Sequence, residues 1–222
     1  SSSMVALLLL PLALALAVRP ASLPTSQPKP LPLKQAIRCL AAQTTGGSSA
    51  TYDERKEAAA LIAQLEQSSP SCTWEERGPL IDGAWEPVYT DNPSAGTVWS
   101  DGRTSRRKLK GAISGRHQQV VTFGPPSSFQ YAQRVRSRVA LGLQAEMRAS
   151  VEAQSDGISW VVSFKDLTWS LLGGRIRLRR TQLPPGSGGT WRTTFLDRDT
   201  RVLRAQSNRG GPPTTYVLMK EQ

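Results

Sequence analysis

Apolar and polar residues change their spacing near Leu80. Before that point, apolar residues recur every three or four positions, as on one face of an amphipathic helix. From Leu80 onward, apolar and polar residues alternate, which is typical of strands with one buried face. The chain therefore predicts a short helical region followed by a longer β-rich region.

Two helices are expected in residues 31–70. The first, over 31–42, carries an apolar stripe of Leu33, Ile37, Leu40 and Ala41. The second begins at Thr51, where Glu54 completes a capping-box pattern, and it ends before Pro70. Its apolar face consists of Ala58, Leu61, Ile62 and Leu65. We interpret the pair as a helical hairpin whose apolar side covers another surface.

Residues 80–222 are expected to form one β domain of about eight strands. The longest alternating run, Val135–Val151, is interpreted as one strand in which Gly142 marks a bend or bulge. Because no helical pattern intervenes, we predict a mainly β fold, a lipocalin-like antiparallel β-barrel preceded by a short helical hairpin. A β-sandwich is the alternative, since alternation does not decide closure. Further strands are expected at 118–123, 158–164, 167–172, 175–181, 190–196, 201–205 and 214–219.

Residues 1–30 are interpreted as a targeting leader. The apolar run Val5–Val18 is too short to span a membrane comfortably, and it ends in Ala15-Leu16-Ala17, a small-x-small pattern. The segment that follows, Arg19–Pro32, is rich in Pro and Ser and lacks acidic residues, so order is not expected there. No positive charge precedes the apolar run, so this chemistry leaves the compartment open.

The formal net charge is +11, and basic residues are clustered. Such clusters attract polyanions, either nucleic acid or a membrane with anionic lipid; a solvated surface is the alternative. We expect the cluster of Arg106, Arg107, Lys108 and Lys110 to face a membrane surface. Two further clusters are Arg134, Arg136 and Arg138, and Arg175, Arg177, Arg179 and Arg180.

Motifs for catalysis or metal binding are absent. The chain has a single histidine, His117, and two cysteines, Cys39 and Cys72, so a zinc cluster is not expected. The cysteines are interpreted as buried thiols, with a disulfide as the alternative. No nucleophile elbow, phosphate-binding loop or dinucleotide fingerprint occurs, and Glu75-Glu76 is interpreted as a solvated loop pair. We therefore predict a protein without catalytic residues, metal or cofactor.

Two constellations remain as candidates for a binding site. Gly83-Ala84-Trp85 has the G-x-W form of a barrel floor, where Trp85 closes one end; a single buried core Trp is the alternative. Asp199 and Arg201 are two positions apart, so on a strand they share a face. They are interpreted as a charged pair at the cavity mouth or as a solvated surface pair. Trp85, Trp160, Trp169 and Trp191 are pocket candidates, although plain core is the more frequent role of strand aromatics.

Two segments of the β region carry a family resemblance. The segment Ile81–Thr90 (IDGAWEPVYT) resembles the opening motif of the plastid lipid-associated proteins, also called plastoglobulins or plant fibrillins. Thr193–Val202, Asn208-Arg209-Gly210 and Tyr216–Lys220 resemble the closing motif of that family. Pro87 departs from the usual aliphatic residue, and Gly211-Pro212-Pro213 lengthens the last turn.

The resemblance implies a barrel in plastids (chloroplasts) that associates with plastoglobules or thylakoids, with residues 1–30 as the transit peptide. It implies lipid binding, with carotenoids, isoprenoid quinones and fatty acids as ligand classes, and no enzymatic activity. The candidate ligand-binding residues are Gly83, Trp85, Tyr89, Thr90, Asp199 and Arg201.

Two alternatives stay open at this point. A basic β-barrel that binds single-stranded nucleic acid would use Phe129 and Tyr131 for base stacking beside Arg134. Against it, the chain has no recognised nucleic-acid motif, and we expect no nucleic-acid partner. The other alternative is a coat protein of lipid globules whose barrel is filled by its own side chains.

Overall fold

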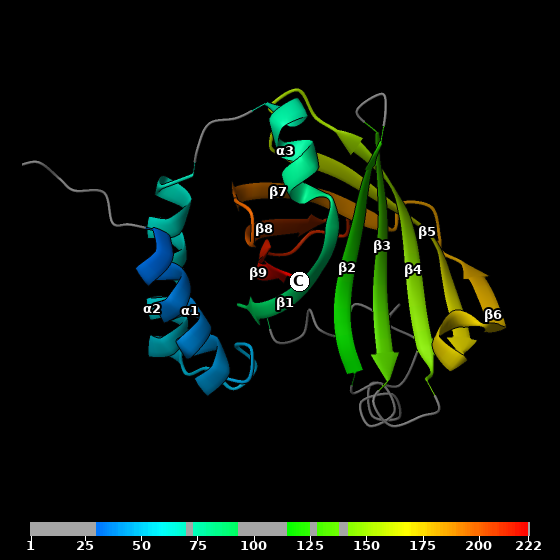
Figure 1. Cartoon of the computed structure of the whole chain (residues 1–222), viewed down its shortest axis with the longest axis horizontal. Helices are drawn as coiled ribbons and strands as arrows, with labels where there is room; N and C mark the ends of the chain where they lie inside the picture. The colour runs from blue at the N-terminus through cyan, green and yellow to red at the C-terminus, as the bar shows by residue number, and fades with distance from the viewer. Residues whose placement is uncertain (1–29, 70–72, 93–114, 125–127, 138–141, 222) are drawn as a thin grey trace, which may run out of the picture.

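The computed structural model describes residues 30–69, 73–92, 115–124, 128–137 and 142–221 (Figure 1). The expected leader and the basic cluster Arg106–Lys110 lie outside these residues. An eight-stranded antiparallel β-barrel, preceded by N-terminal helices, makes up the described chain. This confirms the predicted mainly β fold.

The expected helical hairpin is present as α1 (Pro30–Gln43) and α2 (Tyr52–Gln67). At the start of α2, the Glu54 carboxylate accepts a hydrogen bond from the Thr51 N–H (2.7 Å) and the Thr51 hydroxyl accepts one from the Glu54 N–H (3.3 Å). Two orphan donors of the first turn are thereby satisfied, as the capping box predicts.

A third helix, α3 (Trp74–Ile81), was not predicted. Glu75 and Glu76 lie in its first turn, so their interpretation as a loop pair was wrong. The helix is only eight residues long and contains Gly78 and Pro79, both poor helix formers, which obscures its pattern. Thr73 and Glu76 form its capping box, a signal that the sequence did offer.

Eight strands close into the barrel and a ninth strand, β6, lies beside it. Sequential neighbours pair except for β6 and β7, because β7 pairs with β5 instead. β9 pairs with β1, and the β4–β5 pairing completes closure. This closed ring excludes the β-sandwich alternative. The strands are β1 (Gly83–Thr90), β2 (Gly115–Gly124), β3 (Ser128–Ser137), β4 (Gln144–Ala153), β5 (Ser159–Leu171), β6 (Ile176–Gln182), β7 (Gly188–Leu196), β8 (Thr200–Ser207) and β9 (Thr214–Lys220).

The predicted single strand over Val135–Val151 was wrong. Its two halves belong to β3 and β4, which pair antiparallel from Phe129↔Val151 to Arg136↔Gln144. Gly142, with φ of +67°, lies in the connection rather than at a bend within one strand. Alternation has the same period before and after a chain reversal, so it cannot show where a short hairpin turns.

The opposite error occurred in the next segment. The strands expected at 158–164 and 167–172 are one strand, β5, with a bulge opposite Arg148 and Ala149. The extra residue shifts the alternation by one position, which makes one bulged strand resemble two. The remaining predicted strands agree with β2, β6, β7, β8 and β9 to within a few residues at each end.

Two apolar clusters hold the molecule together. One fills the closed half of the barrel and includes Trp85, Phe129 and Trp160. The other lies outside the barrel, where α1 and α2 cover residues such as Phe195 and Val202. Figure 1 shows the two helices lined up along one side of the barrel, while β6 lies on the far side. The apolar side of the helical hairpin therefore packs against the outer face of the barrel, as the sequence predicted.

Candidate functional site

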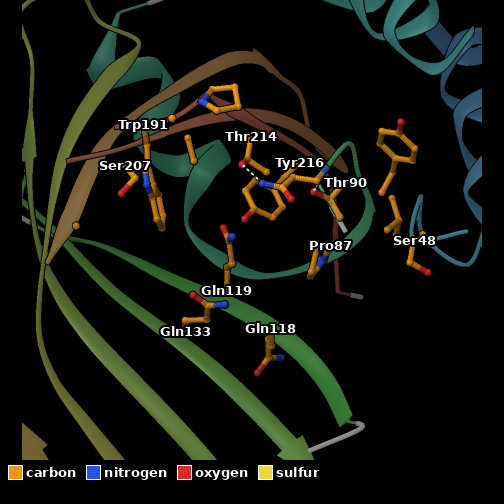
Figure 2. Close-up of a pocket in the computed structure, with 18 of the residues that line it drawn as sticks. Ser48, Pro87, Thr90, Gln118, Gln119, Gln133, Trp191, Ser207, Thr214 and Tyr216 are labelled. Carbon is orange, nitrogen blue, oxygen red and sulfur yellow. Dashed lines mark hydrogen bonds between the residues drawn. The ribbon is translucent and has the colours of Figure 1, made fainter. Parts of the chain in front are cut away.

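A cavity of about 620 Å³ opens at one end of the barrel. It lies where β1 ends, where β8 turns into β9, and where the loop between α1 and α2 meets the rim (Figure 2). The volume lies within the range typical of small-molecule sites. Its walls include Pro87, Gln119, Gln133, Phe164, Trp191, Ala205, Thr214 and Tyr216.

The other end of the barrel is closed. Trp85 is completely buried there, and its Nε1 donates a hydrogen bond to the carbonyl oxygen of Ile81 in α3 (2.8 Å). The Lys220 ammonium lies 5.3 Å from the centre of the Trp85 ring and donates to the carbonyl oxygen of Leu80 (2.9 Å). The short helix α3 and the Trp85 side chain therefore form the barrel floor, at the end opposite the cavity.

The cavity wall combines aromatic and uncharged polar side chains. Trp191 and Phe164 lie with ring centroids 6.0 Å apart. Burial, with a smaller contribution from Asp91, raises the pKa of Tyr216 to about 12, so its hydroxyl is neutral at physiological pH. Figure 2 shows Gln119 and Gln133 beneath Tyr216. Such a wall suits a largely apolar ligand with few polar groups.

The helical hairpin contributes to the rim. The Thr90 N–H donates to the carbonyl oxygen of Gly46 (3.0 Å), and Ser48 lines the cavity. A Cβ on Gly47 would lie 2.2 Å from the Thr90 carbonyl oxygen, and the φ of Gly47 is +89°. Only glycine suits this close approach, which holds the loop between α1 and α2 against the barrel mouth.

A buried polar group lies deeper, between the cavity and the barrel floor. Arg201 is fully buried, and its guanidinium carbon lies 4.6 Å from the centre of the Trp160 ring. Its Nε donates to the Thr193 hydroxyl (3.2 Å). The two terminal nitrogens of Arg201 and the hydroxyl of Tyr131 have no hydrogen-bond partner.

The opening-motif residues occupy three environments. Gly83, with φ of +118°, begins β1, and Trp85 closes the floor; neither lines the cavity. The burial predicted for Trp85 is confirmed. Thr90 and Tyr89 lie at the cavity rim. The ring of Tyr89 packs mainly in the outer cluster beneath the helices, because a β-bulge between Pro87 and Tyr89 reverses the facing of the strand.

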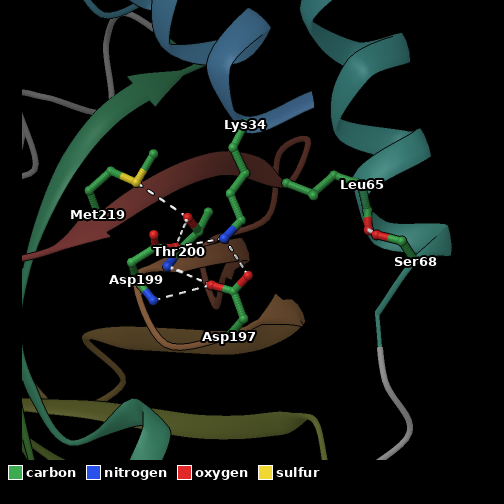
Figure 3. A network of polar contacts seen from close by, with 7 residues as sticks. All are labelled: Lys34, Leu65, Ser68, Asp197, Asp199, Thr200 and Met219. Atoms are coloured by element: carbon green, nitrogen blue, oxygen red, sulfur yellow. Dashed lines mark hydrogen bonds and ion pairs between the residues drawn. The ribbon is translucent and has the colours of Figure 1, made fainter. Parts of the chain in front are cut away.

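The predicted Asp199–Arg201 pair was wrong in both of its forms. β8 begins at Thr200, so Asp199 belongs to the preceding turn, whereas Arg201 points into the barrel. Asp199 instead forms an ion pair with Lys34 of α1 (2.7 Å), which also contacts Asp197 (2.5 Å; Figure 3). Side chains two positions apart share a face only within a strand. Asp199 lies in the turn before β8, so its spacing from Arg201 did not place the two side chains on one face.

The basic clusters have separate outcomes. Arg106, Arg107, Lys108 and Lys110 lie outside the described residues. Arg134 forms an ion pair with Glu146 on the neighbouring strand (2.8 Å). On β6, Arg177 and Arg179 are exposed beside three exposed apolar side chains. These are Leu172 (53% exposed), Ile176 (49%) and Leu178 (53%).

The stacking residues proposed for nucleic acid are not available at the surface. Phe129 and Tyr131 are buried inside the barrel, at 5% and 2% exposure. Phe129 stacks on Trp160 with centroids 5.1 Å apart. Cys39 is a free, exposed thiol, so its predicted burial was wrong, and Cys72 lies outside the described residues.

No protein-family model matches this chain, and no curated protein matches it. No helix in the described ranges has the length and hydropathy needed to cross a membrane. Within those same ranges, no group of His, Cys, Asp or Glu is placed to hold a metal ion.

Sequence reasoning missed most of the cavity wall. Gln119 and Gln133 occupy inward positions on β2 and β3. The sequence offered a signal for them, because each is a polar residue at a position where the alternating pattern calls for an apolar one. Trp191 was named as a pocket candidate and does line the cavity. Tyr216 and Thr214 carried no such signal, because Thr and Tyr are ordinary strand residues.

Proposed function

We propose that the protein binds a lipophilic small molecule inside its barrel, without enzymatic activity. The observation that carries this proposal is the cavity of about 620 Å³ at the one open end. Its wall combines aromatic side chains with uncharged polar groups, which is what an amphipathic lipid requires. The floor of Trp85 and α3 prevents a through-channel, which favours retention of a bound molecule over passage.

Membrane association is the second part of the proposal. β5 continues past the cavity residue Phe164, and β6 pairs with this extension from Asp166↔Gln182 to Leu171↔Ile176. The exposed Leu172, Ile176 and Leu178 therefore stand beyond the cavity mouth, together with Arg177 and Arg179. Apolar side chains among arginines suit the boundary of an anionic membrane, and contact there would bring the mouth close to dissolved lipids.

The family resemblance supports a location for this activity. We propose that the chain is a plastid lipid-associated protein at plastoglobules or thylakoid membranes, where isoprenoid quinones, carotenoids and fatty acids are the candidate ligands. The nucleic-acid alternative loses support, because its stacking residues Phe129 and Tyr131 are buried. A coat protein with a filled barrel would lack the open cavity.

Lipid capture tests the cavity. The protein is incubated with a total plastid lipid extract, re-isolated by gel filtration and analysed for co-eluting lipids by mass spectrometry. We expect one lipid class at near one-to-one stoichiometry. Ala205→Trp, which fills the cavity, should abolish retention, whereas Thr190→Trp on the exposed face of the adjacent strand should not. Retention that survives Ala205→Trp would place the lipid elsewhere and contradict the proposal.

Liposome flotation tests the membrane surface. Each basic residue near an anionic membrane contributes about 1 kcal/mol at low salt, so removing two lowers binding by roughly tenfold or more. We expect this loss for Arg177→Gln/Arg179→Gln, a comparable loss for Arg106→Gln/Arg107→Gln/Lys108→Gln, and a steep fall in wild-type binding with salt. The matched control is Arg38→Gln/Arg198→Gln, which removes two exposed charges elsewhere. Equal binding by all variants would contradict electrostatic docking at both clusters.

A further inference from the structure

Arg201 is a buried cation that the protein does not neutralise. Arg201 has 0% exposure, and among the described residues its one hydrogen bond runs from Nε to the Thr193 hydroxyl (3.2 Å). Both terminal nitrogens lack a partner, and no ion pair involves this residue in the part of the chain that the structure describes. A buried charge without a counter-ion is costly to keep, so its presence calls for a reason beyond packing.

Among the described residues, the group that acts electrostatically on Arg201 is the Tyr131 phenol, and no carboxylate does so. Burial lowers the pKa of Arg201 to about 10, so the guanidinium is still protonated at neutral pH. Burial raises the pKa of the nearby Tyr131, which stays a neutral phenol and supplies no negative charge. The Tyr131 hydroxyl is itself unpartnered. A guanidinium fork and a phenol hydroxyl together match the two oxygens of a carboxylate.

Tyr131 connects this donor pair to the cavity wall. Tyr131 is two residues from Gln133 on β3, and its ring meets the Trp191 ring edge-on with centroids 5.0 Å apart. Gln133 and Trp191 both line the cavity (Figure 2). Gln119, which pairs with Gln133 across β2 and β3, also lines the cavity. The Tyr131 ring therefore connects the cavity wall at Trp191 to the surroundings of Arg201.

We propose that the barrel selects lipids with a carboxylate, which Arg201 and Tyr131 bind while the hydrocarbon chain extends past Trp191 into the cavity. Long-chain fatty acids are the ligand class that this chemistry fits. The inference rests on the proposed function, because it specifies the ligand of the same cavity. A neutral lipid of the same length would leave the guanidinium unpaired, so the site should discriminate strongly against it.

The test compares hexadecanoic acid with hexadecanol, which differ only in the head group. The delipidated full chain is titrated with each at pH 8, and binding is followed by tryptophan fluorescence. We expect the wild type to prefer the acid by about 30-fold or more, because a site built for a polar group rejects an analogue that lacks it. Arg201→Met should lose at least about tenfold for the acid and little for the alcohol.

Two further variants make the outcome decisive. Tyr131→Phe removes only the unpartnered hydroxyl and should weaken acid binding by about three- to tenfold. Arg198→Met removes the same charge from an exposed turn and should bind like the wild type. If Arg201→Met does not fold, the acid-over-alcohol preference of Tyr131→Phe alone tests the inference.

Equal affinity of the wild type for acid and alcohol would overturn the inference and leave the proposed function standing. The same holds if both Arg201→Met and Tyr131→Phe keep the wild-type preference, or if Tyr131→Phe alone keeps it when Arg201→Met is unfolded. Failure of the wild type to bind either lipid would instead overturn the proposed function, and the inference with it.

Discussion

Two large inward-facing side chains in this barrel have opposite hydrogen-bond states. The Trp85 indole donates to a backbone carbonyl in the floor, whereas the Arg201 guanidinium keeps two unpartnered nitrogens. Both side chains have 0% exposure, so burial alone does not distinguish them. A buried aromatic side chain whose N–H is hydrogen-bonded stabilises the fold, whereas a buried cation without hydrogen-bond partners destabilises it. We therefore assign Trp85 to architecture and Arg201 to ligand recognition.

Trp85→Ala tests the architectural assignment. Removing a fully buried Trp leaves a large cavity, so the free energy of unfolding should fall by about 3–5 kcal/mol. Urea denaturation of the purified variant measures this loss, with Trp169→Ala, a partly buried Trp outside the floor, for comparison. A loss below about 1 kcal/mol would show that Trp85 does not close the barrel.

Arg201→Met tests the recognition assignment through stability. Because Met is apolar and of similar length, it removes an uncompensated buried charge, and the lipid-free protein should unfold at a higher temperature than the wild type. Differential scanning calorimetry of delipidated samples makes the comparison, with Arg198→Met as the exposed control. A clearly lower midpoint for Arg201→Met would show that this arginine supports the empty fold.

At the scale of elements, polar contacts fix the helices to the outside of the barrel. The carboxylate of Glu66 in α2 accepts two hydrogen bonds from the Arg204 guanidinium, both 2.8 Å, and one from the Thr194 hydroxyl. In α1, Lys34 contacts Asp197 and Asp199 in the turn between β7 and β8 (Figure 3). These contacts fix the end of the hairpin that is remote from its loop, whereas the hydrogen bond from Thr90 to Gly46 holds the loop at the cavity rim.

The Lys34 contact predicts a specific pH dependence. The hydrogen bond from Lys34, helped by Thr200, lowers the pKa of Asp199 to about 2 from its ordinary 3.8. A lowered carboxyl pKa stabilises the fold above the unfolded-state value, and this stabilisation is lost as the pH falls from about 4 through 2. Because Asp199 is exposed, the contribution is at most about 1 kcal/mol.

Lys34→Met should therefore raise the Asp199 pKa toward its ordinary value and remove this part of the acid sensitivity. Carboxyl chemical shifts from an NMR titration report the pKa directly, with Lys56→Met in α2 as a control that removes a charge from an exposed helix position. An Asp199 pKa that stays near 2 in Lys34→Met would assign the shift to the turn itself.

The sequence indicated elements better than their boundaries. The capping box at Thr51 and Glu54 located the start of α2, because that signal depends on two side chains only. The β3–β4 reversal and the β5 bulge were misjudged, since alternation does not record chain direction and changes phase at a bulge. The environment of Arg201 could not be predicted from the sequence either, because its neighbours Tyr131, Trp160 and Thr193 lie on three other strands.

For the whole molecule, closure of the sheet is the property on which the proposed function depends. The β4–β5 pairing leaves a barrel with a floor at one end and a cavity at the other. The helices stand along one side and β6 extends the opposite wall beyond the mouth (Figure 1). This arrangement would let the mouth and the exposed side of β6 approach a membrane together, as the proposed function requires.

A crystal structure of the protein re-isolated from lipid extract would test the central claim, lipid binding inside the barrel, most directly. We expect continuous ligand density in the cavity between Trp191 and the pair Gln119 and Gln133, with the head group toward Tyr131 and Arg201. Lipid density confined to Leu172, Ile176 and Leu178, with the cavity empty, would contradict internal binding and leave only the outer surface to act on lipids.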